Sequence, residues 1–298
     1  MDEGDGLEER EDFRSKRIVY AIPAMEEAVV LKDITYKIVG DRELKLDVYY
    51  PPDYEGEARL PAVLFVHGDG PSDFLKDAKD WGCYVSWGQL VAASGFVAVT
   101  FNHRSSEALT RLYEAAGDVD DLISYIREHA GTLGIDPDVL GIWTCSAGSP
   151  MGFRSALRNA PSYVRFVISY YGIADLKVYY QEPVGSEAEP GHANEPEQAL
   201  PTFPNEVFEE FSASAYLHKR VGRTTPMFIV RSGLDTPELN ASIDRLITTA
   251  VVNNVDIDVM NHSTGHHAFD ILDDNARSRE IIRATLVFMK AHLTLISL

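Results

Sequence analysis

Five runs of predominantly apolar residues, separated by segments with helical spacing, constrain the fold of this chain most strongly. The runs cover residues 62–66, 96–101, 139–143, 164–171 and 227–230. Strands that are apolar on both faces are typical of the middle of a parallel sheet, where helices cover both sides. Between the runs, apolar residues recur at i, i+3, i+4 and i+7, as they do over residues 119–126. This alternation predicts a doubly wound, mostly parallel sheet with helices on both faces.

Three further segments define the expected organisation. Residues 34–39 and 44–50 alternate apolar and polar side chains, which predicts two antiparallel strands with one solvated face. Residues 1–17 are densely charged, so we expect a solvated N-terminal arm or a fraying helix there, followed by a single domain over residues 18–298. Residues 181–204 are rich in proline and lack periodicity, which predicts a lid or a plain surface insertion over about residues 175–215.

The composition narrows the class of protein. The chain has 27 Lys and Arg against 46 Asp and Glu, a net charge of −19, which disfavours nucleic acids and anionic membrane surfaces as partners. Its acidic start differs from a signal peptide, and no run reaches the roughly 20 apolar residues that span a bilayer. Its two cysteines are too few for a zinc cluster. We therefore expect a cytoplasmic protein without a metal or another cofactor.

A serine follows the apolar run at residues 139–143, where the chain passes from a predicted strand into a predicted helix. The sequence TCSAG over residues 144–148 is similar to the nucleophile elbow, usually written G-x-S-x-G, with Ser146 as the nucleophile. The turn is sharp, and strand and helix approach closely, so only small residues fit on either side of the serine. Gly148 meets this requirement, whereas Thr144 departs from it. The alternative is that Ser146 only caps the helix.

The sequence HGDG over residues 67–70 follows the first apolar run and predicts an oxyanion-binding loop. We expect the backbone N–H groups of Asp69, Gly70 and Ala147 to stabilise the negatively charged oxygen of a tetrahedral intermediate. The carboxylate of Asp69 would oppose that charge, so it must point away or have a partner. The alternative is a tight turn with a structural His67.

A base and an acid follow two later predicted strands. His266 and His267 follow the apparent strand over residues 255–260, and Asp235 follows the apolar run that ends at residue 230. The carboxyl ends of the strands are where an open α/β sheet places its active groups. The alternative for Asp235 is a helix cap.

The motifs at residues 67–70, 134–138, 142–148, 233–235 and 267–269 together resemble those of the α/β-hydrolase carboxylesterases, in particular the dienelactone hydrolase-like and feruloyl esterase-like group. The resemblance covers roughly residues 30–295. It implies the α/β-hydrolase fold, with Ser146 as the nucleophile, Asp235 as the acid and His267 as the base. His267 is preferred to His266 because the family places its histidine two residues before an aromatic residue. Dienelactone hydrolases proper use a cysteine, but Cys145 would put Trp143 at the position that needs a small residue, so we expect a buried thiol.

The resemblance and the residues together predict a serine hydrolase that cleaves small neutral carboxylic esters through an acyl-enzyme. A serine peptidase or amidase would use the same triad, and a non-catalytic member of the fold would keep the site as a ligand pocket. An apolar wall for the acyl group or ordinary packing would explain five aromatic residues near the insertion, Tyr179, Tyr180, Phe203, Phe208 and Phe211. Residues 286–298 are apolar on more than one side, which would suit either a homodimer contact or packing against the sheet.

Overall fold

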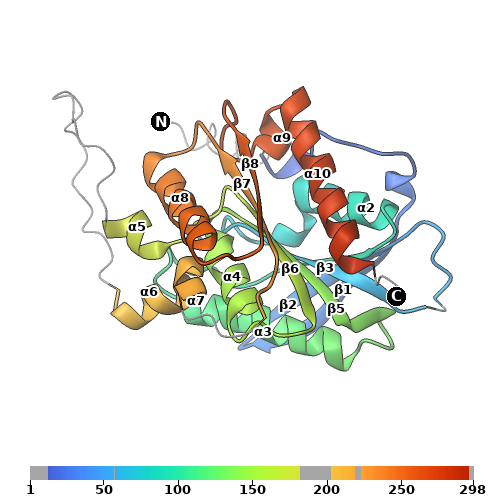
Figure 1. Ribbon diagram of the computed structural model, residues 1–298. Coiled ribbons are helices and arrows are strands. Elements are labelled where there is room, and N and C mark those ends of the chain that lie inside the picture. The colour runs from blue at the N-terminus through green and yellow to red at the C-terminus, as the bar shows by residue number, and fades with distance from the viewer. Residues whose placement is uncertain (1–12, 57, 182–202, 219–222, 295–298) are drawn as a thin grey trace, which may run out of the picture.

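A sheet with the strand order β1-β2-β4-β3-β5-β6-β7-β8 forms the centre of the computed structural model, which describes residues 13–56, 58–181, 203–218 and 223–294 (Figure 1). The strands are β1 (Val29–Val39), β2 (Arg42–Tyr50), β3 (Leu60–Val66), β4 (Val97–Phe101), β5 (Ile135–Cys145), β6 (Val164–Tyr170), β7 (Met227–Ser232) and β8 (Ile257–His262). The pairs β1–β2 and β2–β4 are antiparallel, and the pairs from β4 to β8 are parallel. This arrangement confirms the predicted mostly parallel sheet.

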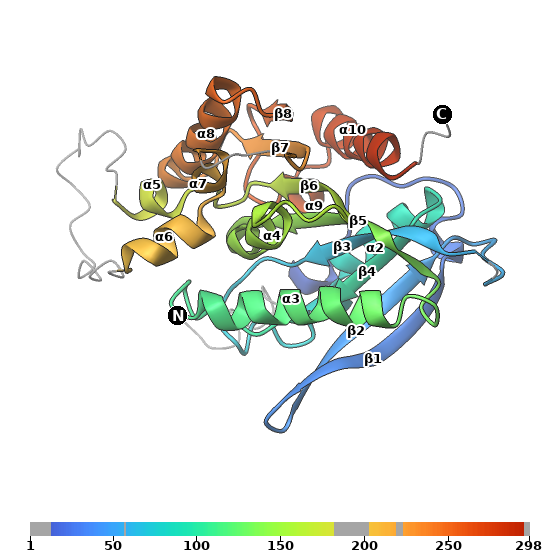
Figure 2. The same cartoon turned by 60° about the horizontal axis from the view of Figure 1, so that its bottom comes forward.

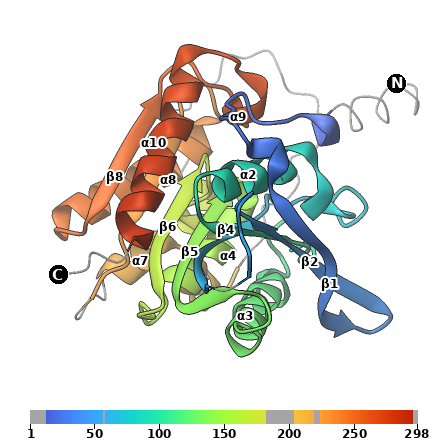
Figure 3. The ribbon, with the colours of Figure 1, turned by 90° about the vertical axis from the view of Figure 1, so that its right-hand side faces the viewer.

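Helices cover both faces of the sheet. They are α2 (Gly82–Ala93), α3 (Leu112–Glu128), α4 (Ser149–Leu157), α5 (Leu176–Gln181), α6 (Asn205–Phe211), α7 (Ala213–His218), α8 (Pro237–Val252), α9 (Phe269–Leu272) and α10 (Ala276–Leu293), with short 3₁₀ turns η1 (Met25–Glu27), η2 (Ala78–Asp80) and η3 (Ser146–Gly148). Helices α2 and α10 lie on one face, and α3, α4 and α8 lie on the other (Figures 2 and 3). Each face therefore has its own hydrophobic core, and the sheet separates the two.

The helical spacing that the sequence predicts agrees with the structure. The apolar positions predicted over residues 119–126 are buried on α3 and pack against the sheet. The C-terminal helix α10 begins at Ala276, where the Asn275 side chain caps it by accepting hydrogen bonds from Arg277 N and Ser278 N. Within the described residues, no helix combines the length and the apolar character needed to cross a membrane.

Two predicted segments extend beyond the described residues. Of the predicted arm, residues 1–12 lie outside them. The remaining residues, 13–17, are not a free arm, because Phe13 packs against Phe74 and Trp81, and Arg14 donates to the carbonyl oxygen of Phe74 at 2.9 Å. Of the predicted lid, residues 182–202 lie outside the described residues, and the flanking chain forms α5, α6 and α7.

Gly141 and Gly117 offer a matched test of packing in this fold. A Cβ atom on Gly141, in β5, would overlap the ring of buried Phe166, whereas one on Gly117, in α3, would meet nothing within 4 Å. Gly141→Ala should lower the free energy of unfolding by about 1–3 kcal/mol through overpacking. Gly117→Ala should raise it by about 0.4–1 kcal/mol through helix propensity and a smaller unfolded-state entropy. Urea unfolding measures both, and equal stability of the two variants would contradict this account of the core.

Candidate active site

Ser146 lies at the sharp turn between β5 and α4. Its φ angle of 51° is in the left-handed region, which is strained for a residue other than glycine. Two residues later there is no room for a side chain, because a Cβ atom on Gly148 would overlap the carbonyl oxygen of His67. The backbone N–H of Ile173 donates to the Ser146 carbonyl oxygen at 3.2 Å. These contacts fix the turn against the loops that follow β3 and β6, as an elbow requires.

Thr144 stands where the elbow pattern has a glycine, and Gly152 accommodates it. The Thr144 side chain is fully buried against α4. A Cβ atom on Gly152 would lie 2.8 Å from Thr144 Cβ and 2.9 Å from its Cγ2 atom. Because Gly152 on α4 has no side chain, it leaves the space that the Thr144 side chain fills. This exchange explains the departure that the sequence motif shows.

Three of the predicted site residues form a continuous hydrogen-bonded chain. Ser146 Oγ lies 2.9 Å from His267 Nε2, and His267 Nδ1 lies 2.6 Å from Asp235 Oδ2. The other Asp235 oxygen accepts the Thr236 backbone N–H at 2.9 Å. Because a carboxylate only accepts hydrogen bonds, it places the imidazole proton on Nδ1 and leaves Nε2 free to take the proton of the serine.

The neighbouring histidine is engaged elsewhere. His266 is exposed, and its Nδ1 lies 3.0 Å from Asp273 Oδ1, while its backbone N–H donates to Asp273 Oδ2. His267 instead packs its ring against Tyr171, with 4.7 Å between the ring centroids. Of the two histidines, only His267 contacts Ser146.

Of the three residues predicted as oxyanion donors, Ala147 follows Ser146 in the turn, and Asp69 and Gly70 are consecutive in the loop that follows β3. Among the described residues, the backbone N–H groups of Asp69, Gly70 and Ala147 donate to no acceptor, whereas the N–H of Gly68 donates to Tyr84 Oη at 2.9 Å. Asp69 lines a cavity together with Ser146, and Gly70 and Ala147 do not. The Asp69 carboxylate accepts hydrogen bonds from Ser106, so it has the partner that the sequence required.

A cavity of about 260 Å³ extends from Ser146 and His267 toward α2. Seven aromatic residues line it, from the N-terminal segment, the chain between β3 and α2, α2 itself and the ends of β5 and β6: Phe13, Phe74, Trp81, Tyr84, Trp87, Trp143 and Tyr171. None of the five aromatic residues near the insertion lines it, and Phe208 and Phe211 are buried in the core on the opposite face. No local pattern pointed to this wall, because its members come from distant parts of the chain and Phe13 lies in a charged stretch.

Two polar groups border the inner part of this cavity. The Asp270 carboxylate accepts hydrogen bonds from Trp87 Nε1 at 2.9 Å and Tyr171 Oη at 2.6 Å, and burial raises its pKa above the ordinary value. Burial also raises the pKa of Cys145 to about 12, so its thiol is protonated at neutral pH, as expected for an inert buried cysteine. Within the described ranges, no three His, Cys, Asp or Glu side chains are grouped as metal ligands.

The sheet order, together with a serine after β5, an acid after β7 and a histidine after β8, defines the α/β-hydrolase fold. The chain belongs to the BD-FAE family, whose family model matches residues 46–237. It is 25% identical to esterase LipQ of Mycobacterium tuberculosis over 291 residues, which cover 90% of this chain and 63% of LipQ. It is 26% identical to the probable isoprenylcysteine alpha-carbonyl methylesterase ICME of Oryza sativa over 152 residues, 51% of this chain and 34% of that protein. The chain thus spans less than two thirds of the length of these relatives.

Solved structures share the fold over nearly the whole chain. The native structure of the thermophilic esterase Est2 from Thermogutta terrifontis matches with a TM-score of 0.66 and 18% identity, covering 93% of this chain and 97% of that one. The same esterase phosphorylated by paraoxon matches with a TM-score of 0.61 and 17% identity, covering 90% and 93%. At this identity the likeness establishes the common fold.

The contact between Thr144 and Gly152 can be tested by a double-mutant cycle. Gly152→Ala should lower the free energy of unfolding by about 1–3 kcal/mol, because the new methyl group meets a buried side chain. Adding Thr144→Gly should recover part of that loss, with a coupling energy of at least about 0.5 kcal/mol. Urea unfolding of the wild-type protein and the three variants gives this energy. Strictly additive effects would show that the two residues do not compete for the same space.

Acid should destabilise the fold through His67. Burial, together with the nearby His103, holds the pKa of His67 well below its ordinary value. A histidine in the unfolded chain titrates near pH 6.5, so on acidification the unfolded chain binds a proton before the folded protein does. The free energy of unfolding that His67 contributes above pH 6.5 is therefore lost progressively as the pH falls below that value. His67→Gln should therefore reduce the difference in unfolding free energy between pH 7 and pH 5. An unchanged difference in urea titrations at both pH values would contradict this linkage.

Proposed function

We propose that this protein is a serine hydrolase that cleaves carboxylic esters through an acyl-enzyme. The observation that carries the proposal is the hydrogen-bonded chain from Ser146 through His267 to Asp235. The names of the relatives support it, since LipQ is an esterase and the Thermogutta terrifontis esterase has been phosphorylated by paraoxon. A hydroxyl that hydrogen-bonds to an imidazole oriented by a carboxylate is the arrangement that activates serine for acyl transfer.

The proposed reaction has two halves. Ser146 Oγ attacks the ester carbonyl carbon while His267 Nε2 accepts the hydroxyl proton, and Asp235 stabilises the imidazolium that forms. The imidazolium then gives its proton to the departing alkoxide, which leaves as the alcohol. In the second half, His267 accepts a proton from water, the resulting hydroxide attacks the acyl-enzyme, and Ser146 regains its proton as the acid leaves.

The carbonyl oxygen becomes negatively charged in both halves. We assign the backbone N–H groups of Asp69, Gly70 and Ala147 to its stabilisation, since they have no acceptor among the described residues, Ala147 follows Ser146, and Asp69 lines the same cavity as Ser146. Removal of one donor of this kind typically costs about 3 kcal/mol of transition-state stabilisation.

The cavity indicates the class of substrate. Its volume of about 260 Å³ and its aromatic wall suit a small apolar or aromatic acyl group. The buried carboxylate of Asp270 on the same wall disfavours an anionic acyl group. We therefore propose small neutral esters as substrates.

Removal of the nucleophile is the direct test of the function. Ser146→Ala should lower kcat for nitrophenyl esters by about 10³–10⁶-fold, because the covalent step is lost. The free energy of unfolding should not fall. Ser124→Ala on α3, whose hydroxyl donates to the Asp120 carbonyl oxygen, is the matched serine control and should keep full activity. Paraoxon should label the wild-type protein and not the Ser146→Ala variant.

The same assay separates the alternatives. A panel of nitrophenyl esters of graded acyl length should be hydrolysed far faster than the corresponding nitroanilides, with short acyl groups preferred. Comparable anilide turnover would favour an amidase or peptidase. A folded protein that paraoxon does not label and that turns over no ester would favour a non-catalytic binding protein. Full activity of the Ser146→Ala variant would overturn the assignment of the nucleophile.

A further inference from the structure

The carboxylate of Asp69 is adjacent to the backbone N–H that the proposed mechanism directs at a negatively charged oxygen. If the carboxylate faced the cavity, its charge would oppose the charge that develops in the transition state. Ser106 holds this carboxylate with two donors: its backbone N–H lies 3.2 Å from Asp69 Oδ1 and 3.1 Å from Oδ2, and its hydroxyl donates to Oδ2. Both carboxylate oxygens therefore have a partner on the loop that follows β4.

We propose that Ser106 is a positioning residue for the ester-cleaving site. It holds the Asp69 carboxylate on the side of the β4 loop, so that the backbone N–H of Asp69, and not its negative charge, acts on the oxyanion. This inference rests on the proposed function.

The orientation of Ser106 is itself fixed by its own loop. Its hydroxyl oxygen accepts the Leu109 backbone N–H at 2.9 Å, which directs the hydroxyl proton toward Asp69. Its carbonyl oxygen accepts the Arg111 backbone N–H at 2.7 Å. Residues 107–109 all have left-handed backbones, with φ angles of 48, 54 and 68°. Three consecutive non-glycine residues in this region are strained, and such strain persists where surrounding contacts impose it, often at functional sites.

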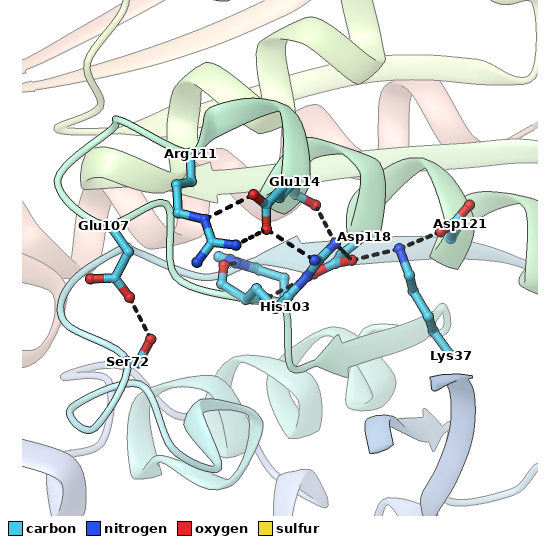
Figure 4. Close-up of polar contacts among 9 residues, drawn as sticks. Lys37, Ser72, His103, Glu107, Arg111, Glu114, Asp118 and Asp121 are labelled. Carbon is cyan, nitrogen blue, oxygen red and sulfur yellow. Dashed lines mark hydrogen bonds and ion pairs between the residues drawn. The ribbon is translucent and has the colours of Figure 1, made fainter. Parts of the chain in front are cut away.

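Two more side-chain contacts, on either side of Ser106, join this loop to the loop that follows β3. The Ser105 hydroxyl donates to the Gly70 carbonyl oxygen at 2.6 Å. The Ser72 hydroxyl donates to Glu107 Oε1 at 2.6 Å (Figure 4). The two loops are therefore joined at three successive positions, with the Asp69–Ser106 contact between the others.

An ion-pair network anchors the β4 loop to α3 (Figure 4). Arg104 donates to both oxygens of the fully buried Asp118, from Nε at 2.9 Å and from Nη2 at 2.8 Å, and Lys37 Nζ lies 2.6 Å from Asp118 Oδ1. Glu114 on the same helix pairs with both Arg104 and Arg111. Burial would raise the pKa of Asp118, but hydrogen bonds from Arg104 and Lys37 outweigh it and lower that pKa. Asp118 thus stays charged at neutral pH, and its ion pair with Arg104 anchors the loop to α3.

A set of variants tests the positioning role. Ser106→Ala should lower kcat for a nitrophenyl ester by about 10–100-fold and change KM by less than about twofold, because only the transition state carries the opposed charge. Adding Asp69→Asn should restore most of that kcat, since the neutral amide cannot repel the oxyanion. Thr110→Ala is the matched control, because it removes a hydroxyl hydrogen bond to Glu107 in the same loop without touching Asp69, and should keep kcat within about twofold.

The rescue separates positioning from a general structural effect. Loss of activity in Ser106→Ala that Asp69→Asn does not reverse, or a kcat within threefold of wild type, would overturn the positioning role while ester hydrolysis by the wild-type protein stands. Absence of both ester hydrolysis and paraoxon labelling in the wild-type protein would overturn the proposed function, and the role of Ser106 with it. If the alanine variant does not fold, Ser106→Cys keeps the volume with a weaker donor and should show a smaller loss, also reversed by Asp69→Asn.

Discussion

The close packing of the turn after β5 beneath the loop after β3 is the constraint on which the rest of the structure depends. Because the His67 carbonyl oxygen leaves no room for a side chain at Gly148, helix and loop meet backbone to backbone. This approach places the Ser146 hydroxyl beside Asp69 in one cavity. The parallel strand order then brings the ends of β7 and β8, and with them Asp235 and His267, to the same edge of the sheet.

Much of the fold and the hydrogen-bonded chain at Ser146 could be predicted from the sequence because their signals are local. Each buried strand is a short apolar run, and each candidate group follows such a run within a few residues. The position of His267 before Phe269 distinguished it from His266, and the structure places His267 against Ser146 and His266 against Asp273. Local patterns of this kind survive folding because a strand end fixes where the next few residues can lie.

The features that the sequence did not predict depend on contacts between distant segments. The sequence motif alone makes Thr144 unfavourable, but Gly152 on the neighbouring helix leaves the space for its side chain. The partner of the Asp69 carboxylate, Ser106, lies 37 residues away on another loop. The charged stretch around Phe13 predicted a solvated arm, yet that ring packs on Trp81 at the cavity wall. Composition describes the average of a segment, whereas one aromatic residue can decide where it docks.

The cavity wall and the hydrogen-bonded chain come from different parts of the molecule. Ser146, Asp235 and His267 are supplied by turns at the carboxyl edge of the sheet, whereas Phe13 lies in the N-terminal segment and Trp81 at the N-cap of α2. Replacements of these wall residues can change which substrates fit the cavity without disturbing the proposed reacting groups. Related hydrolases can in this way differ in substrate specificity while they keep the same reaction.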